Sequence, residues 1–158
     1  MTPLNSSLEV GMRTLVLLSE SFPAPLDLAQ LVYMDHAVLH SADLGGPESL
    51  HPSLPAGPGE LAMRRSLIEQ GLAVLLRAGL AEVEATPDGL VYRASEEGPG
   101  FVGILTAPYM SDLRSRARWL VHEHGAPEVD ARSATLAITN RWAQEFRDRL
   151  PLAGGDHA

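Results

Sequence analysis

The 158-residue sequence contains no cysteine and no lysine. Without cysteine, disulfide bonds and thiolate metal sites are both excluded. All twelve basic residues are arginine, a pattern typical of a GC-rich coding bias. The N-terminal MTPLNSSLEV lacks the basic start and apolar core of a signal peptide, and no apolar run approaches the about 18 residues of a spanning helix. We therefore expect a soluble, cytoplasmic protein with no membrane contact.

Recognisable catalytic motifs are also missing. No serine lies in a G-x-S-x-G elbow, and there is no cysteine nucleophile. The glycine pair of Leu44–Pro47 lacks the Lys and Ser/Thr that follow in a phosphate-binding P-loop. His36 is followed by Ala37, so the glutamate of a HExxH protease is absent. These absences predict a protein that is not an enzyme, with no catalytic residue and no cofactor.

The charge balance bears on nucleic-acid binding. The formal net charge is -8 and the sequence pI is near 5.1. Proteins that grip nucleic acid without sequence preference present a clustered basic face, which this balance disfavours. A small local arginine patch is still compatible with it.

Residues 60–94 carry the clearest fold signal. Apolar residues at helical spacing run to Gly79, which is placed for a left-handed helix cap, with apolar Leu80 just beyond it. Thr86-Pro87-Asp88-Gly89 then has the chemistry of a tight turn. We predict a long helix followed by strands around Ala81–Ala85 and Leu90–Ala94, the only clear β-structure. A helix that runs into such a hairpin is the second half of a winged helix-turn-helix.

Four further helices surround this unit. Ser6 and Asp27 have the spacing of capping boxes with Glu9 and Gln30, and they open helices that end near Phe22 and Ser41. Two more helices are expected over residues 109–124 and 132–149. The predicted class is mainly α (α+β). The predicted organisation is a winged helix-turn-helix domain (1–95) with a long inserted loop (42–59), a C-terminal helical extension packed on it (96–150) and a flexible tail (151–158).

A cluster of polar residues surrounds the end of the second helix. His36 and His40 lie four residues apart, with Asp35 beside them and Asp43 and His51 downstream. Histidines at this spacing can share one metal ion. Hydrogen bonds that cap the helix and fasten the loop are the commoner role of such groups, so we favour a structural cluster with no metal.

Two groups of arginines are candidates for contacts with other molecules. Arg64 and Arg65 lie in the first turns of the third helix, where a DNA-reading helix presents its side chains, so they are candidate nucleic-acid contacts. Glu60 and Glu69 share this helix, and solvated surface arginines are the commoner alternative. Arg114, Arg116 and Arg118 form the densest positive run, which is either a solvated face or a surface for an acidic partner.

The segment 35–52, DHAVLHSADLGGPESLHP, resembles the middle component family of ABC-three component systems. LDLAQLVYMD, GELAMRRSLIEQGLAVLLRAGLAEV, PYMSDLRSRARWLV and NRWAQEFRDRL also resemble that family, so the resemblance covers most of the chain. Its matching residues are Asp35, His40, Ser41, Asp43, Gly45, Gly46, Pro47, Ser49, Leu50, His51 and Pro52. The resemblance implies a small non-enzymatic subunit encoded between an ABC ATPase and a third component, in systems thought to act in bacterial defence against invading DNA.

We therefore predict an adaptor that bridges the ABC ATPase and the third component, an effector or sensor. DNA contact through the complex and a homodimer are further options. The proposed interaction motif is Asp35, His40, Ser41, Asp43, Gly45, Gly46, Pro47 and His51, in a hydrogen-bonded knot that fixes Gly45–Pro52 against the second helix. Two alternatives remain: a winged-helix transcription regulator that dimerises through its terminal helices, and a metal-dependent enzyme that uses His36, His40 and His51.

Overall fold

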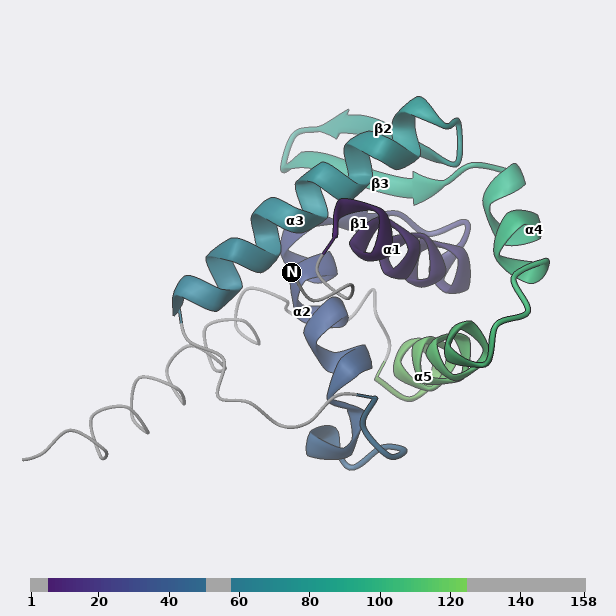
Figure 1. Cartoon of the computed structure of the whole chain (residues 1–158). Coiled ribbons are helices and arrows are strands. Elements are labelled where there is room, and N and C mark those ends of the chain that lie inside the picture. Colours follow the sequence, from purple (N-terminus) through teal and green to yellow (C-terminus); the bar gives the residue numbers. More distant parts are fainter. Residues whose placement is uncertain (1–5, 51–57, 125–158) are drawn as a thin grey trace, which may run out of the picture.

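The computed structural model describes residues 6–50 and 58–124 (Figure 1). The described part is mainly helical, with one small antiparallel sheet. Its elements in chain order are α1 (Ser7–Ser21), β1 (Leu26–Asp27), α2 (Leu28–Leu39), the 3-10 helix η2 (Ser41–Leu44), α3 (Pro58–Arg77), β2 (Ala81–Thr86), β3 (Gly89–Ala94), α4 (Glu97–Gly103) and α5 (Pro108–His124). The predicted helix over residues 132–149 and the predicted tail lie outside the described residues.

Local side-chain chemistry sets the ends of the helices. The Ser6 side chain accepts from the Glu9 backbone N–H, and Asp27 and Gln30 form the complete reciprocal capping box at the start of α2. Gly79 adopts φ 72° after α3, and the Leu80 N–H donates to the Leu75 carbonyl. Such a left-handed residue satisfies the last carbonyls of a helix. The predicted capping box at Asp27 and the predicted cap at Gly79 are confirmed, and at Ser6 the bond from the Glu9 N–H is present.

The sheet consists of a hairpin and one short added strand. β2 and β3 pair in antiparallel register from Ala81↔Ala94 to Thr86↔Gly89, as the turn chemistry predicts. The prediction that this hairpin would be the only β-structure was wrong, because β1 pairs with β3 at Leu26↔Tyr92. Two residues before a helix carry no strand pattern of their own, and only the neighbouring hairpin makes them a strand.

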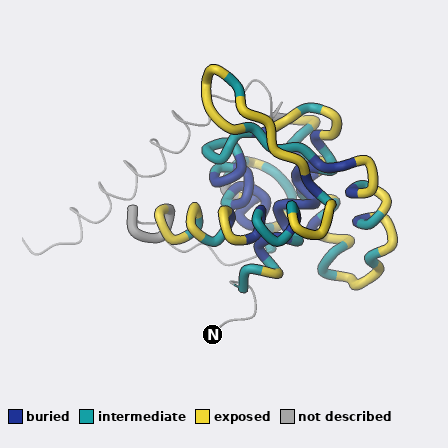
Figure 2. Tube along the Cα trace, turned by 90° about the horizontal axis from the view of Figure 1, so that it is seen from above, coloured by how far each residue is buried: buried dark blue, intermediate teal, exposed yellow. Residues whose placement is uncertain are grey.

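The hydrophobic core lies between α1, α2, α3 and α5 (Figures 1 and 2). Its largest fully buried side chains are Leu15, Leu17, Leu18, Leu26, Leu31, Ile68, Leu72 and Leu113. α1 and α3 cross so closely that a Cβ added to Gly71 would lie 2.8 Å from the Gly11 backbone nitrogen. Glycine at this crossing lets the two backbones approach each other.

The residues after the hairpin wrap back onto α1 and α2. The first part of the FVGILTAP run that follows Gly100 completes α4, which contacts α1. α5 spans the predicted residues and packs against α1 and α2. No helix within residues 6–50 and 58–124 is long and apolar enough to cross a membrane.

Candidate functional site

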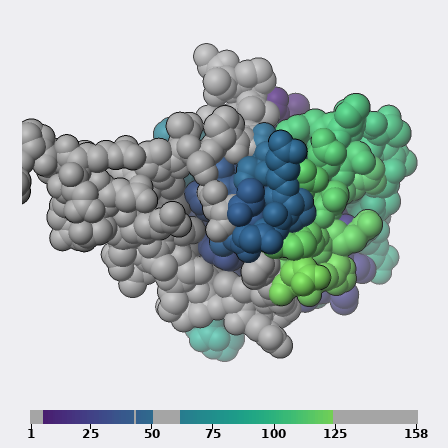
Figure 3. All heavy atoms as spheres, turned by 90° about the horizontal axis from the view of Figure 1, so that it is seen from below, coloured from purple at the N-terminus to yellow at the C-terminus, as the bar shows by residue number. Residues whose placement is uncertain are grey.

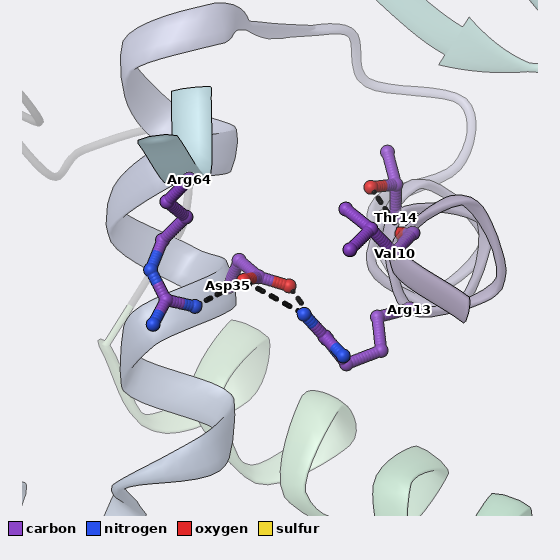
Figure 4. A network of polar contacts seen from close by, with 5 residues as sticks. All are labelled: Val10, Arg13, Thr14, Asp35 and Arg64. Carbon is purple, nitrogen blue, oxygen red and sulfur yellow. Dashed lines mark hydrogen bonds and ion pairs between the residues drawn. The ribbon is translucent and has the colours of Figure 1, made fainter. Parts of the chain in front are cut away.

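A buried carboxylate lies between two arginines where α1, α2 and α3 meet (Figure 4). Asp35 of α2 is completely buried, and Arg13 Nε of α1 donates to its Oδ1 at 2.9 Å. Arg64 of α3 pairs with the other carboxylate oxygen, Oδ2. The Arg13 side chain is 4% exposed and that of Arg64 is 13% exposed. One aspartate therefore joins three helices of the fold.

Both arginines act on the ionisation of this carboxylate. Burial alone would raise the pKa of Asp35, because it penalises the charged form. The charges of Arg13 and Arg64, together with their hydrogen bonds, outweigh burial and hold the pKa below its ordinary value. Tyr109 of α5 lies near this network. Burial raises the pKa of its hydroxyl, Arg13 opposes that rise and Asp35 adds to it.

The two candidate nucleic-acid contacts on α3 have different surroundings. Arg64 is directed into the molecule toward Asp35. Arg65 is exposed, and its Nε lies 3.5 Å from a Glu69 carboxylate oxygen. The pairing of Arg64 could not be read from helical spacing, because Asp35 precedes it by 29 residues. Arg13 did carry a signal, since an arginine inside the apolar stretch Val10–Leu18 needs a buried partner.

Residues 41–50, hereafter the 41–50 loop, are fastened by two serines. The Ser41 hydroxyl is buried and donates to the Pro47 carbonyl at 2.9 Å. The Ala42 backbone N–H donates to the Ser49 hydroxyl at 3.0 Å. Gly45 adopts a left-handed φ of 75° and ends η2. A hydrogen-bonded loop was predicted, and among the residues of the loop the side chains of Ser41 and Ser49 make its described side-chain bonds.

Helix α5 holds the outer side of the 41–50 loop. Arg116 donates to the Glu48 carbonyl through both Nε and Nη2, at 3.0 and 2.9 Å. The Trp119 indole lies on Gly46, where an added Cβ would be 2.4 Å from two ring carbons. Figure 3 shows the loop, in blue, lying against α5, in green. The sequence alone placed Arg116 in a solvated face or partner surface and gave Trp119 no role. Their contacts with the loop could not be read from local spacing, because Arg116 lies 68 residues after Glu48.

His36 and His40 lie at the C-terminal end of α2, just before this loop in the chain. The ring centroids of His36 and His40 lie 4.7 Å apart, and His40 is largely buried. Within the described residues, no group of three His, Cys, Asp or Glu side chains is arranged to hold a metal ion. The Asp43 side chain and all of His51 lie outside the described part. The metal alternative requires His51 and so stays a prediction.

Replacing Gly46 by alanine tests the packing of Trp119 on the 41–50 loop. We expect the indole to move, and the free energy of unfolding to fall by about 1–3 kcal/mol, the usual range for an overpacked contact. Near-ultraviolet circular dichroism measures the indole environment, and denaturation measures stability. Gly103→Ala is the control, because no atom lies within 4 Å of a Cβ added there. An unchanged indole signal in Gly46→Ala would contradict the packing.

The arginines of α5 and of the hairpin are engaged within the chain. Arg114 donates to the Leu105 carbonyl at 3.3 Å, and Arg118 lies 3.7 Å from Glu20. Arg93 of β3 pairs with Glu84 of β2. Arg77, at the end of α3, is exposed and has no ion pair among the described residues. The described surface therefore presents few cations without a neighbouring acceptor.

A family model described as "ABC-three component (ABC-3C) system Middle Component 2" matches residues 3–145. The match spans the buried ion network, the 41–50 loop, the hairpin and α5. It confirms the resemblance that residues 35–52 carry. No curated protein and no solved structure matches the chain.

Proposed function

Because this chain belongs to the Middle Component 2 family of ABC-three component systems, we propose that it is a non-enzymatic adaptor subunit. Family membership makes it a subunit of a multi-component system. In the proposal it bridges the ABC ATPase and the third component, and the assembled complex serves in defence against invading DNA. It would act in the cytoplasm and contact DNA through the complex rather than by itself.

We further propose that the described part is a winged helix-turn-helix. The order of elements supports this, with α1, β1, α2 and α3 followed by the β2–β3 hairpin. The strand order β1-β3-β2 supports it as well, because the first strand lies beside the last. In this architecture α3 occupies the position of the DNA-reading helix, and the hairpin is the wing.

The adaptor proposal rests on one observation: three arginines on α3 and the wing lie beside carboxylates of the same chain. Arg64 pairs with the buried Asp35, Arg65 lies beside Glu69, and Arg93 pairs with Glu84. A winged helix that grips DNA uses such side chains on phosphates. Here the same positions stabilise the fold or neutralise carboxylates, which favours a protein partner over nucleic acid.

Besides α3 and the wing, the 41–50 loop is a candidate contact surface for a protein partner. Ser41 and Ser49 fasten it from within, and Arg116 and Trp119 hold it from α5. A loop held at so many points presents a fixed shape to a partner without a large entropy loss on binding. Co-purification of tagged chain with the co-expressed ABC ATPase and third component tests the proposal. Failure of the wild-type chain to bind either subunit would overturn it.

We expect the isolated chain to bind duplex DNA weakly. Its net charge is -8, and Arg64, Arg65 and Arg93 on α3 and the wing have acidic neighbours. Fluorescence anisotropy with labelled duplexes at about 0.15 M salt should give a dissociation constant of about 10⁻⁴–10⁻⁶ M or weaker, the range of non-specific binding. Submicromolar binding that is lost in Arg65→Ala would instead favour the transcription regulator.

A further inference from the structure

The outer edge of β2 is not paired within the described part of the chain. β3 is the central strand, because β1 pairs with one of its sides and β2 with the other. β2 is therefore an edge strand, and it is six residues long. Figure 2 shows the hairpin as a mostly exposed loop that extends from the body of the molecule. An exposed edge of this length is a template on which another strand can pair.

The hairpin register determines which backbone groups of β2 face outward. Thr86 and Gly89 flank a two-residue loop, so they form a hydrogen-bonded pair. Pairs alternate along an antiparallel ladder, so Glu84 and Glu82 also bond to β3. The N–H and C=O groups of Val83 and Ala85 therefore point away from β3, toward the open edge.

The side chains of β2 divide into an acidic face and an apolar face. Glu82 and Glu84 are exposed on one face, and the Glu84 carboxylate pairs with Arg93. Val83 and Ala85 lie on the other face, where Leu90 is opposite Ala85. Val83 is 46% exposed and Leu90 is 53% exposed. A strand added at this edge would find carboxylates on one face and apolar side chains on the other.

This charge pattern disfavours a second copy of the chain as the added strand. Antiparallel pairing of two β2 strands about Val83 would place Glu82 of each copy opposite Glu84 of the other. Like charges directly opposite each other destabilise a strand pair. The same carboxylates repel the phosphates of nucleic acid. Arginine or lysine side chains on an added strand would instead form favourable cross-strand pairs with them.

We propose that the β2 edge binds an extended protein segment in which apolar and basic residues alternate. The segment adds a fourth strand beside β2. Its main chain bonds to the outward groups of Val83 and Ala85, its apolar side chains cover Val83, and its basic side chains lie beside Glu82 and Glu84. The inference deepens the proposed adaptor function by assigning one subunit contact to the wing, and it rests on that function only for the identity of the subunit.

Amide hydrogen exchange of the full chain tests strand addition directly. In the free chain, the Val83 and Ala85 amides should exchange faster than those of Glu82 and Glu84. A short peptide of alternating valine and arginine should slow exchange at Val83 and Ala85 by about tenfold or more, because each amide gains a hydrogen bond. A peptide of alternating valine and glutamate is the control. No protection, or equal protection by both peptides, overturns the inference.

Two variants, with Val83→Thr as a control, extend the test to the subunits themselves. Val83→Pro removes an outward N–H, and edge strands tolerate proline at such positions. With the purified ABC ATPase and third component as probes, it should weaken binding of one of them by about tenfold, whereas Val83→Thr should not. Glu82→Gln with Glu84→Gln alters no backbone group and should weaken the same interaction. Undiminished binding by both Val83→Pro and the glutamine pair overturns the wing contact.

The outcomes separate this inference from the proposed function. If the wild-type chain binds neither subunit but the arginine peptide protects Val83 and Ala85, the adaptor proposal fails and the strand site stands. If the subunits bind without protecting β2, the adaptor stands and the wing contact fails. Protection that depends on chain concentration alone would identify a second copy as the occupant. Protection by duplex DNA would identify nucleic acid, and either result overturns the inference.

Discussion

Replacing Asp35 by alanine is expected to lower the free energy of unfolding by about 3–5 kcal/mol, the range for removing one member of a buried ion pair. The substitution leaves the Arg13 guanidinium, with a side chain 4% exposed, without its carboxylate. It also releases Arg64 and so loosens the contact between α2 and α3. Since domains of this size have about 5–15 kcal/mol of stability, much of the total is lost. Urea denaturation measures the change.

Asp112→Ala is the matched control, because it removes an exposed aspartate from α5. Surface substitutions of this kind usually change stability by no more than about 0.5 kcal/mol. A similar small change in Asp35→Ala would contradict the three-helix network. Arg64→Met tests the same network from α3, and it should destabilise less than Asp35→Ala because Arg13 continues to pair with the carboxylate.

The same residue gives the chain a dependence on acid. The pKa of Asp35 is lowered in the folded state, so the folded chain binds fewer protons there than the unfolded chain. The stability that this difference supplies is complete above the unfolded pKa of about 3.9 and is lost as the pH falls through the folded pKa. Asp35→Asn has no ionisable carboxylate at this position and therefore lacks this pH-dependent contribution to stability. The stability difference between wild type and Asp35→Asn should therefore shrink below about pH 4.

Replacing Gly71 by alanine is expected to destabilise the chain even though alanine favours helices. At a solvent-exposed helix position, alanine stabilises the helix by about 1 kcal/mol relative to glycine. Here the new Cβ would lie 2.8 Å from the Gly11 nitrogen and 2.9 Å from its Cα. Both are backbone atoms, so α1 and α3 must separate. We expect a net loss of about 1–3 kcal/mol, as for other overpacked contacts.

Gly100→Ala provides the control for this glycine. It lies inside α4, and no atom is within 4 Å of an added Cβ. Its stability should be unchanged or rise by up to about 1 kcal/mol, because alanine has the higher helix propensity. Calorimetry of the two variants should therefore give shifts of opposite direction, or a shift in Gly71→Ala alone. A more stable Gly71→Ala would contradict the close crossing.

The elements predicted correctly from the sequence depend on neighbours in the chain. Asp27 caps α2 through Gln30, three residues away, and Gly79 ends α3 through its own φ. The turn at Pro87 and Asp88 likewise needs only four consecutive residues. Caps and turns form between residues a few positions apart, so residue type and spacing within a short segment suffice to predict them.

The features that sequence reasoning missed depend on distant partners. β1 exists because Leu26 meets Tyr92, and Asp35 is neutralised by arginines 22 and 29 residues away. Gly46 is required by the Trp119 indole, which belongs to another helix. A single sequence names these residues but does not say which of them meet. For that reason the sequence leaves Arg64 as either a solvated surface arginine or a nucleic-acid contact, and it assigns Trp119 to no site.

The contact of Trp119 with Gly46 limits which segments could be exchanged between members of the family in a chimaeric protein. Consider a chimaera that takes residues 41–50 from a relative and keeps α5 of this chain. The relative's loop would then lie against the Trp119 indole and Arg116 of this chain. Effects of residues in contact are not additive, so the two segments would have to be transplanted together. The smallest exchangeable unit is therefore discontinuous in the chain, and it joins the loop to the helix that covers it.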